Sequence, residues 1–216
     1  MRTKSEVIEL ITETRLVAIL RLPDLSRALR LSEALLEGGA GVQEFTLTNP
    51  EALEAIKEVR AKLPAFNEGR AAVGAGSVRS LAEAEAAIEA GAQFIVTPIT
   101  QLEVIAACKE AGVPITPGAF TPTEIATAWE AGADIVKVFP ARALGPGYIK
   151  DLLAPMPYLK LMPTGGIDLE NLGDYLDHGS VAVGVGGNLL DKEAIRSGDW
   201  EKITATAAAY TAKARR

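Results

Sequence analysis

The stretch that decides how this chain folds is Glu130-Ala-Gly-Ala-Asp-Ile-Val-Lys-Val-Phe-Pro140. A polar, alanine-containing segment ends at Gly132, and a short apolar run follows at once. Glycine commonly ends a helix because it adopts the left-handed backbone conformation without a steric penalty. A short, continuous run of Val and Ile is typical of a parallel strand that is buried on both faces. The stretch therefore predicts a helix, a glycine turn and a buried strand.

The same pattern recurs along the chain, for example at Glu37–Leu47, Glu89–Thr97 and Glu110–Thr116. Eight apolar runs suit buried strands, at a mean spacing of roughly two dozen residues, which fits a minimal strand–loop–helix–loop unit. The runs are Leu16–Arg21, Val42–Thr48, Ala71–Gly74, Phe94–Thr97, Pro114–Thr116, Asp134–Phe139, Leu159–Met162 and Val181–Val185.

Helix-start signals follow several of these strands. Three segments fit the capping-box pattern, and Asn49-Pro50 is a cap followed by proline. The three are Ser80-Leu-Ala-Glu83, Thr100-Gln-Leu-Glu103 and Thr121-Pro-Thr-Glu124. Eight strands that each lead into a helix indicate an α/β fold, a single (β/α)8 TIM barrel with an N-terminal helix. A doubly wound open sheet is the competing fold, but the first turn, Arg21-Leu-Pro-Asp24, lacks the glycines typical of it.

Length and composition favour one domain over residues 1–216, because 216 residues with 48% hydrophobic content suffice for one sizeable core. The net charge is −6, the pI is about 5.0, and the basic residues are scattered. Nucleic acid and anionic membranes are therefore not expected as partners. The first residues form a charged amphipathic pattern, and no stretch is long and apolar enough to span a bilayer. A cytoplasmic location is expected.

Thiol and metal chemistry find little support. The one cysteine, Cys108, lies in a helical pattern as a small apolar residue, and it excludes an internal disulfide. The one histidine, His178, precedes a glycine at an expected helix end. A histidine-rich zinc site is thereby excluded, and a Ser-His-Asp triad would need His178. No acidic cluster at a strand end indicates a carboxylate metal site, so no metal is expected.

Lys137 is the principal catalytic candidate. Two apolar residues flank it on each side, and a Phe-Pro turn follows. An ammonium group on the inner face of a buried strand loses its hydration, so its pKa falls and part of it is neutral amine near pH 7. A neutral lysine amine is a Schiff-base nucleophile. The alternatives are a lysine paired with a buried carboxylate for stability, or one that points outward to water.

Glu44 is the second candidate, a carboxylate in an otherwise apolar strand. It has the same strand parity as Val42, Thr46 and Thr48. If that parity is inward, Glu44 shares a low-dielectric cavity with Lys137, where its pKa rises toward the range useful for proton transfer. A simple buried ion pair between the two residues is the alternative interpretation.

Glycine pairs follow the seventh and eighth expected strands, in Pro163-Thr-Gly-Gly-Ile167 and Gly184-Val-Gly-Gly-Asn188. In barrels the active site lies at the carboxyl ends of the strands, and the loops after strands seven and eight commonly bind phosphate through backbone N–H groups. A phosphorylated substrate is therefore expected. Arg21 and Ser77, at the ends of the first and third strands, are candidates for binding a carboxylate. A structural ion pair is the alternative for Arg21.

Together these motifs resemble the 2-keto-3-deoxy-6-phosphogluconate aldolase family, also called the 2-keto-4-hydroxyglutarate aldolase family. The resemblance covers nearly the whole chain. It is carried by Val17–Arg21, Glu44–Pro50, Val73–Val78, Phe94–Pro98, Pro117–Glu124, Val136–Pro140, Pro163–Gly166 and Gly184–Gly186. It implies a metal-free and cofactor-free class I aldolase, a lyase of the Entner–Doudoroff pathway of carbohydrate metabolism. Such an enzyme reversibly cleaves 2-keto-3-deoxy-6-phosphogluconate to pyruvate and glyceraldehyde 3-phosphate. Side activity on 2-keto-4-hydroxyglutarate and a homotrimeric assembly are implied as well.

The resemblance also implies a role for individual residues. Lys137 matches the lysine that forms the imine with pyruvate, and Glu44 matches the glutamate that moves protons, partly through water. The remaining matched positions are expected to bind substrate. Pro98 and Phe139 wall the pyruvyl pocket, Thr164, Gly165 and Gly166 shape the site, Ser77 stands where a threonine commonly lies near the carboxylate, and Gly186 and Gly187 belong to the phosphate loop.

Two positions depart from the family pattern. Many members have an arginine where Thr48 stands, so Arg21, Thr48 and Ser77 are expected to share the carboxylate. A serine that often contacts phosphate is matched by Gly187, which leaves mainly backbone donors. Two alternatives remain: another phosphate-binding barrel enzyme, such as a thiamine phosphate synthase or a phosphosugar isomerase, and a non-catalytic oligomeric scaffold that retains the fold.

Overall fold

The computed structural model describes residues 3–216, and the first two residues of the expected N-terminal amphipathic segment lie outside the described residues. The strands are β1 (Leu16–Leu20), β2 (Val42–Thr46), β3 (Ala72–Gly76), β4 (Ile95–Val96), β5 (Ile115–Thr116), β6 (Gly118–Ala119), β7 (Val136–Val138), β8 (Leu161–Pro163) and β9 (Val183–Val185). Each predicted run contains a strand, although β3 and β8 extend beyond their runs and β6 lies outside all of them.

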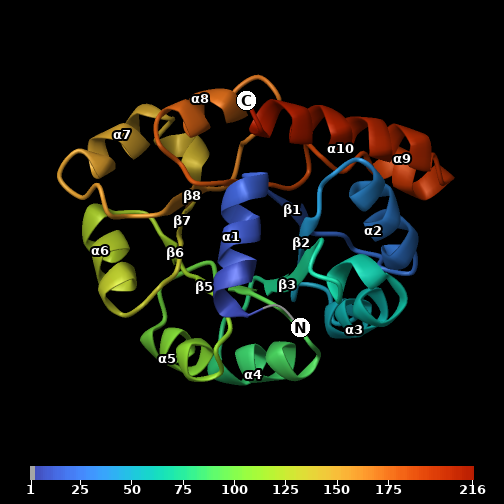
Figure 1. Ribbon diagram of the computed structural model, residues 1–216, viewed down its shortest axis with the longest axis horizontal. Helices are drawn as coiled ribbons and strands as arrows, with labels where there is room; N and C mark the ends of the chain where they lie inside the picture. Colours follow the sequence, from blue (N-terminus) through green and yellow to red (C-terminus); the bar gives the residue numbers. More distant parts are fainter. Residues whose placement is uncertain (1–2) are drawn as a thin grey trace.

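Helices separate the strands and surround them (Figure 1). The helices are α1 (Lys4–Thr14), α2 (Ala28–Glu37), α3 (Ala52–Lys62), α4 (Leu81–Glu89), α5 (Leu102–Glu110), α6 (Pro122–Glu130), α7 (Gly147–Leu153), α8 (Leu172–Asp177), α9 (Lys192–Ser197) and α10 (Trp200–Ala214). Short 3₁₀ turns occur at Pro64–Phe66 and Ala141–Ala143. None of the helices in residues 3–216 combines the length and apolarity required to cross a membrane.

The strands close into the predicted (β/α)8 barrel. Parallel pairing gives the orders β5-β4-β3-β2-β1-β9 and β6-β7-β8. Only Pro117 separates β5 from β6, so together they form the fifth barrel strand, interrupted where proline has no N–H to donate. A bridge between Thr164 and Gly184, and a 3.0 Å hydrogen bond from Val181 N to Leu161 O, join β8 to β9 and close the circle.

The two faces of the barrel wall carry different side chains. Residues of one parity, such as Leu20, Phe45 and Val138, pack outward in the core cluster that includes the helices. Residues of the other parity point into the barrel. Those near the strand starts form a second apolar cluster with α1, made of Val7, Leu10, Ile11, Val17, Val42, Ala72, Phe94, Val96, Ile135, Met162 and Ala182.

Helix α1 closes the amino-terminal end of the barrel. Its buried residues Val7, Leu10 and Ile11 contact this lower interior layer, and α1 lies across the centre of the ring of helices in Figure 1. Thr3 and Glu6 form a capping box that begins the helix. Since the lower end is filled, a ligand has access to the interior only from the carboxyl ends of the strands.

The predicted helix starts agree with the structure in some cases and differ from it in others. The capping box of Thr121 and Glu124 is confirmed, with Pro122 at the first turn. Ser80 caps α4 through Glu83 N. The predicted box at Thr100 is wrong, because the Thr100 hydroxyl donates to Gly118 O at 3.0 Å and α5 begins at Leu102 without a side-chain cap.

Asn49 caps the turn that precedes helix α3. Its Oδ1 accepts from Glu51 N at 2.9 Å, and α3 begins only at Ala52. Its Nδ2 donates to Leu22 O and to Pro23 O, both at 3.1 Å, which ties the first strand's loop to the second. The predicted helix start at Pro50 is therefore early by two residues.

Candidate active site

A cavity of about 380 Å³ opens at the carboxyl ends of the strands, above the layer sealed by α1. Two larger depressions, of about 640 and 620 Å³, lie on the outer surface and do not include Lys137. The cavity at the barrel mouth is lined by Ile19, Arg21, Lys137, Phe139, Arg142, Thr164, Gly165, Gly166, Ile167, Gly184, Gly186, Gly187 and Asn188. It contains no carboxylate side chain, which suits an anionic ligand.

Lys137 reaches this cavity from the middle of β7. Its strand parity turns it inward, and only 4% of the residue is exposed. Burial lowers the pKa of the Lys137 amine, the negative charge of Glu44 opposes that fall, and the positive charge of Arg21 adds to it. The Nζ atom lies 5.0 Å from the centre of the Phe139 ring. A buried amine with a lowered pKa at the wall of a cavity is placed for nucleophilic attack.

Glu44 lies inside the barrel in β2, with 1% of the residue exposed, so its strand parity, left open by the sequence, is inward. Burial raises the pKa of the Glu44 carboxyl, whereas the charges of Lys137 and Arg21 act in the opposite direction. Among the described residues, no carboxylate oxygen lies within 4.0 Å of Lys137 Nζ. The two groups therefore influence each other through space and do not form a direct ion pair.

The Glu44 carboxylate occupies room that a glycine leaves free. A Cβ atom at Gly76 would lie 1.8 Å from Glu44 Oε1 and 2.3 Å from Cδ, so no other residue fits there without displacing the carboxylate. Glu44 Oε2 is buried and makes no hydrogen bond with the described residues. A buried carboxyl with one unpaired oxygen and a raised pKa is suited to receive and return a proton.

Arg21 and Ser77 contact each other beyond the ends of the first and third strands. Arg21 Nη2 donates to Ser77 Oγ at 3.2 Å. Ser77 has a left-handed φ of 56°, which is uncommon for a residue other than glycine. Arg21 also lines the cavity and is exposed, so its guanidinium retains donors for a ligand.

Thr48 and Pro98 lie outside the cavity lining. The hydroxyl of Thr48 is 2.9 Å from that of Thr46, which keeps it next to β2. The backbone of Pro98 packs against Gly118, where a Cβ atom would lie 2.3 Å from Pro98 O. Of the two residues predicted to wall the pyruvyl pocket, Phe139 lines the cavity and Pro98 does not.

The two predicted glycine loops follow the adjacent strands β8 and β9, and both line the cavity. Gly165 and Gly166 have φ values of 95° and 84°, a conformation that favours glycine. In the neighbouring strand β9, Gly184 leaves room for the Thr164 side chain, since a Cβ atom there would lie 2.4 Å from Thr164 Oγ1. Gly186 and Gly187 complete the rim. The Thr164 hydroxyl is buried and has no hydrogen-bond partner among the described residues.

Several lining residues were missed from the sequence, chiefly Arg142 and Asn188. Asn188 Nδ2 donates to Ile167 O at 2.9 Å and thereby connects the two glycine loops. Arg142 follows β7 by a few residues, the same kind of position from which Arg21 was recognised at the first strand. That position was the signal available in the sequence.

The isolated cysteine and histidine lie away from this cavity. Cys108 is buried in α5, where burial raises the pKa of its thiol to about 11. His178 caps the end of α8, and its Nδ1 lies 2.6 Å from Asp174 O. Within residues 3–216, no three His, Cys, Asp or Glu side chains are grouped so as to hold a metal ion.

Comparison with known proteins identifies one family. Residues 7–206 match the family model described as KDPG and KHG aldolase. The chain is 35% identical over 202 residues to a 2-dehydro-3-deoxy-phosphogluconate aldolase of Haemophilus influenzae, covering 93% of both chains. It is also 35% identical over 206 residues to a 2-dehydro-3-deoxy-6-phosphogalactonate aldolase of Escherichia coli, covering 95% of this chain and 96% of the other.

Among solved structures, a KDPG aldolase from Legionella pneumophila superposes with a TM-score of 0.83 at 29% identity. The match covers 94% of this chain and 96% of that one. That structure holds pyruvate captured at low pH as a covalent carbinolamine intermediate.

Proposed function

This chain belongs to the KDPG and KHG aldolase family, and we propose that Lys137 is the residue through which it performs the family's chemistry. The chain is a class I aldolase, a carbon–carbon lyase. The substrate we propose is 2-keto-3-deoxy-6-phosphogluconate, cleaved reversibly to pyruvate and glyceraldehyde 3-phosphate. The observation that carries the proposal is the buried Lys137 amine, with its lowered pKa, at the wall of an open cavity free of carboxylates.

The reaction begins at the C2 ketone. The neutral Nζ of Lys137 attacks C2 to form a carbinolamine, and loss of water gives a protonated imine. Removal of the proton from the C4 hydroxyl then breaks the C3–C4 bond, and its electrons pass into the imine to form an enamine. Glyceraldehyde 3-phosphate leaves as the aldehyde. Protonation of C3 and hydrolysis of the imine release pyruvate and restore the amine.

Glu44 is the proposed proton carrier for these steps. Its pKa is raised by burial, and its carboxylate has an oxygen without a partner in the described structure. Because Glu44 does not line the cavity, it acts on the substrate directly only after a small movement, or otherwise through a water molecule. Its negative charge also favours the positively charged imine on Lys137.

The substrate's two anionic ends fit the two sides of the cavity. We propose that Arg21, held by Ser77, binds the carboxylate next to C2, with Thr164 and Phe139 beside it. Thr48 and Pro98 support this end from outside the lining. The backbone groups of Gly165, Gly166, Gly186 and Gly187 are the proposed phosphate donors.

The assay that tests the function is pyruvate release from 2-keto-3-deoxy-6-phosphogluconate and from its 4-epimer, the phosphogalactonate analogue. The parent protein is expected to cleave the gluconate form faster, and Lys137→Met to cleave neither. Lys150→Met, which alters an exposed lysine on α7, serves as the matched control and is expected to retain full activity. Cleavage by Lys137→Met would overturn the assignment of the lysine. A parent that releases no pyruvate from either epimer would favour the non-catalytic scaffold.

We also propose that the enzyme is a cytoplasmic homotrimer. Three large apolar side chains, Ile99, Leu102 and Tyr158, are each more than half exposed, which supports an association surface. Phosphorylated sugar acids are charged and do not cross bilayers freely. An enzyme that uses them is therefore expected in the compartment where they are made, which supports the proposed cytoplasmic location.

A further inference from the structure

The cavity at the barrel mouth contains three basic residues, Arg21, Lys137 and Arg142, and no acidic one. Two of the three already have a task in the proposed function. Lys137 reacts with the ketone, and Arg21 is bound to Ser77 at the carboxylate end. Arg142 remains, an arginine for which neither the sequence motifs nor the proposed reaction gives a role.

The backbone of Arg142 is fixed by a hydrogen bond, whereas its guanidinium has no partner among the described residues. Its backbone N–H donates to Gly165 O at 2.9 Å. Its Cβ lies against Gly166, so closely that a Cβ atom on that glycine would be 2.6 Å away. Among the described residues, no carboxylate lies within 4.0 Å of its guanidinium and no side-chain hydrogen bond engages it. Arg142 is also exposed, so its charge is available to a ligand at the cavity mouth.

The neighbouring loop after β9 provides no side-chain donor for a phosphate at its exposed position Gly187. Gly187 has nothing within 4 Å of the place where a Cβ atom would lie, so this position presents only backbone and open space, and the loop's one side-chain donor, Asn188, is neutral and already donates to Ile167 O. Backbone N–H groups orient a phosphate but leave most of its charge uncompensated. Arginine binds phosphate with two parallel hydrogen bonds, a geometry that also selects against neutral ligands.

We infer that Arg142 is the specificity-determining residue for the phosphoryl end of the substrate, supplying the charge that the Gly186-Gly187 loop lacks. The inference rests on the proposed function and deepens it. Arg142 does not touch the reacting carbons. It distinguishes phosphorylated aldehydes from unphosphorylated ones of the same carbon skeleton.

The test compares two aldehydes in the direction of carbon–carbon bond formation, each with saturating pyruvate: D-glyceraldehyde 3-phosphate and D-glyceraldehyde. Arg142→Gln is expected to lower kcat/KM for the phosphorylated aldehyde by about 10- to 100-fold, the range for one lost charged hydrogen-bonding pair. The change for glyceraldehyde is expected to stay within about threefold, since its neutral end makes no charged contact. Arg142→Lys, which keeps the charge but not the fork, is expected to fall between Arg142→Gln and the parent.

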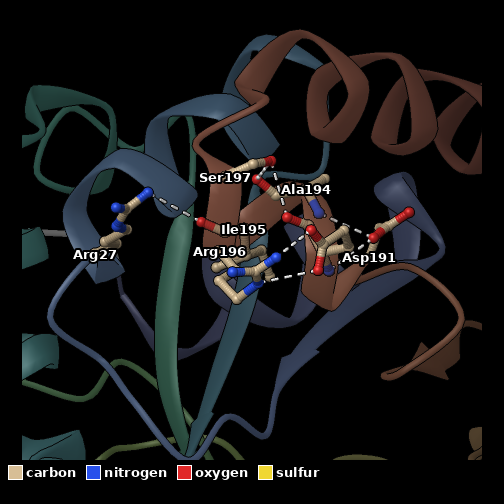
Figure 2. A network of polar contacts seen from close by, with 7 residues as sticks. Arg27, Asp191, Ala194, Ile195, Arg196 and Ser197 are labelled. Atoms are coloured by element: carbon tan, nitrogen blue, oxygen red, sulfur yellow. Dashed lines mark hydrogen bonds and ion pairs between the residues drawn. The ribbon is translucent and has the colours of Figure 1, made fainter.

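Arg196→Gln is the matched control, since it removes one positive charge from the same protein at a site outside the cavity lining. Arg196 lies on α9, where its Nε and Nη2 donate to Glu193 at 3.0 and 2.5 Å. Figure 2 shows it within the polar network of α9 that also contains Asp191 and Ser197. Its ratio of kcat/KM values for the two aldehydes is expected to equal that of the parent.

Two results would overturn the inference: an equal loss with both aldehydes in Arg142→Gln, or an unchanged ratio between them. Reduction with borohydride in the presence of pyruvate separates such a failure from failure of the proposed function. If the variant still forms the pyruvyl adduct while the ratio is unchanged, only the role of Arg142 is lost. If the parent forms no adduct, the proposed function fails and the role of Arg142 fails with it.

Discussion

Glu44 and Arg21 act in opposite directions on the pKa of Lys137. The negative charge of Glu44 stabilises the ammonium form, and the positive charge of Arg21 destabilises it. The nucleophile is the neutral amine, so the pH at which imine formation reaches half its maximal rate follows the pKa of Lys137. Both neighbours therefore influence the pH range in which the enzyme forms the imine. Glu44 does so without direct contact with the lysine.

Glu44→Gln is expected to move the midpoint of imine formation to lower pH, because the charge that raises the pKa of Lys137 is removed. Arg21→Gln is expected to move it to higher pH, because a charge that lowers that pKa is removed. The measurement is the rate of pyruvate trapping by cyanoborohydride at saturating pyruvate across a pH series, with Arg196→Gln as an unshifted control. Shifts of both variants in the same direction would contradict this account of the site's electrostatics.

At this scale, sequence reasoning reached Lys137 and Glu44 because a charge within an apolar strand is conspicuous. Their inward orientation follows from strand parity once a barrel is assumed. Arg142 was not found, because it lies in the 3₁₀ turn Ala141–Ala143 that no periodicity describes, among other surface arginines. The absence of a partner for its guanidinium is visible only in three dimensions.

At the scale of the element, strand β3 makes room for the carboxylate of its neighbour. Gly76→Ala would place a Cβ atom 1.8 Å from Glu44 Oε1, so Glu44 must move or β3 must shift. We expect a loss of about 1–3 kcal/mol in the free energy of unfolding and a fall of about 10²-fold in kcat. Urea denaturation and the pyruvate-release assay measure the two effects.

Gly147→Ala is the control for this substitution. Gly147 begins α7, and nothing lies within 4 Å of its added Cβ atom. We expect unchanged kcat and equal or slightly higher stability, since alanine favours the helix by up to about 1 kcal/mol. If Gly76→Ala left the free energy of unfolding and kcat as little changed as Gly147→Ala does, the close packing of Glu44 against β3 would contribute to neither stability nor catalysis.

Helix α1 stabilises the barrel from the end opposite the chemistry. Ile11 is 1% exposed within the lower interior cluster, so Ile11→Ala is expected to cost about 2–5 kcal/mol of unfolding free energy through the cavity it leaves. At temperatures where the variant remains folded, kcat/KM is expected to stay within about twofold of the parent. Glu9→Ala, on the exposed face of the same helix, is the control and is expected to change neither quantity. A large loss of kcat/KM in Ile11→Ala would show that α1 influences the site.

The elements were predictable to the extent that local chemistry decides them. Glycine turns after amphipathic helices marked the strands, and Thr121 with Glu124 marked a helix start. The Thr100 cap was predicted wrongly because its hydroxyl bonds to Gly118 O, a partner from the next barrel strand. The break at Pro117 was not predicted either, although proline cannot donate to a neighbouring strand.

At the scale of the whole molecule, the barrel follows from the count and order of the strands. The order of the elements does not show how the barrel closes. Closure depends on the bridge between Thr164 and Gly184, and on glycines that leave room for inward-facing side chains. The outer surface carries large apolar side chains, Ile99, Leu102 and Tyr158, that are exposed to solvent in a single chain.

The proposed homotrimer predicts a solution mass of three times 22.7 kDa. Light scattering on a size-exclusion column measures that mass without a shape assumption, and dilution tests whether the assembly is stable. A mass equal to one chain at all concentrations would contradict the proposal and leave Ile99 and Leu102 without a covering partner.

The central claim is that Lys137 forms the imine, and intact-mass spectrometry after incubation with pyruvate and borohydride tests it most directly. We expect the parent and Lys150→Met to gain the mass of one reduced pyruvyl group, with peptide mapping placing it on Lys137. Lys137→Met is expected to gain none while unfolding with a single cooperative transition like the parent's. An adduct on another lysine, or an adduct retained in folded Lys137→Met, would contradict the account.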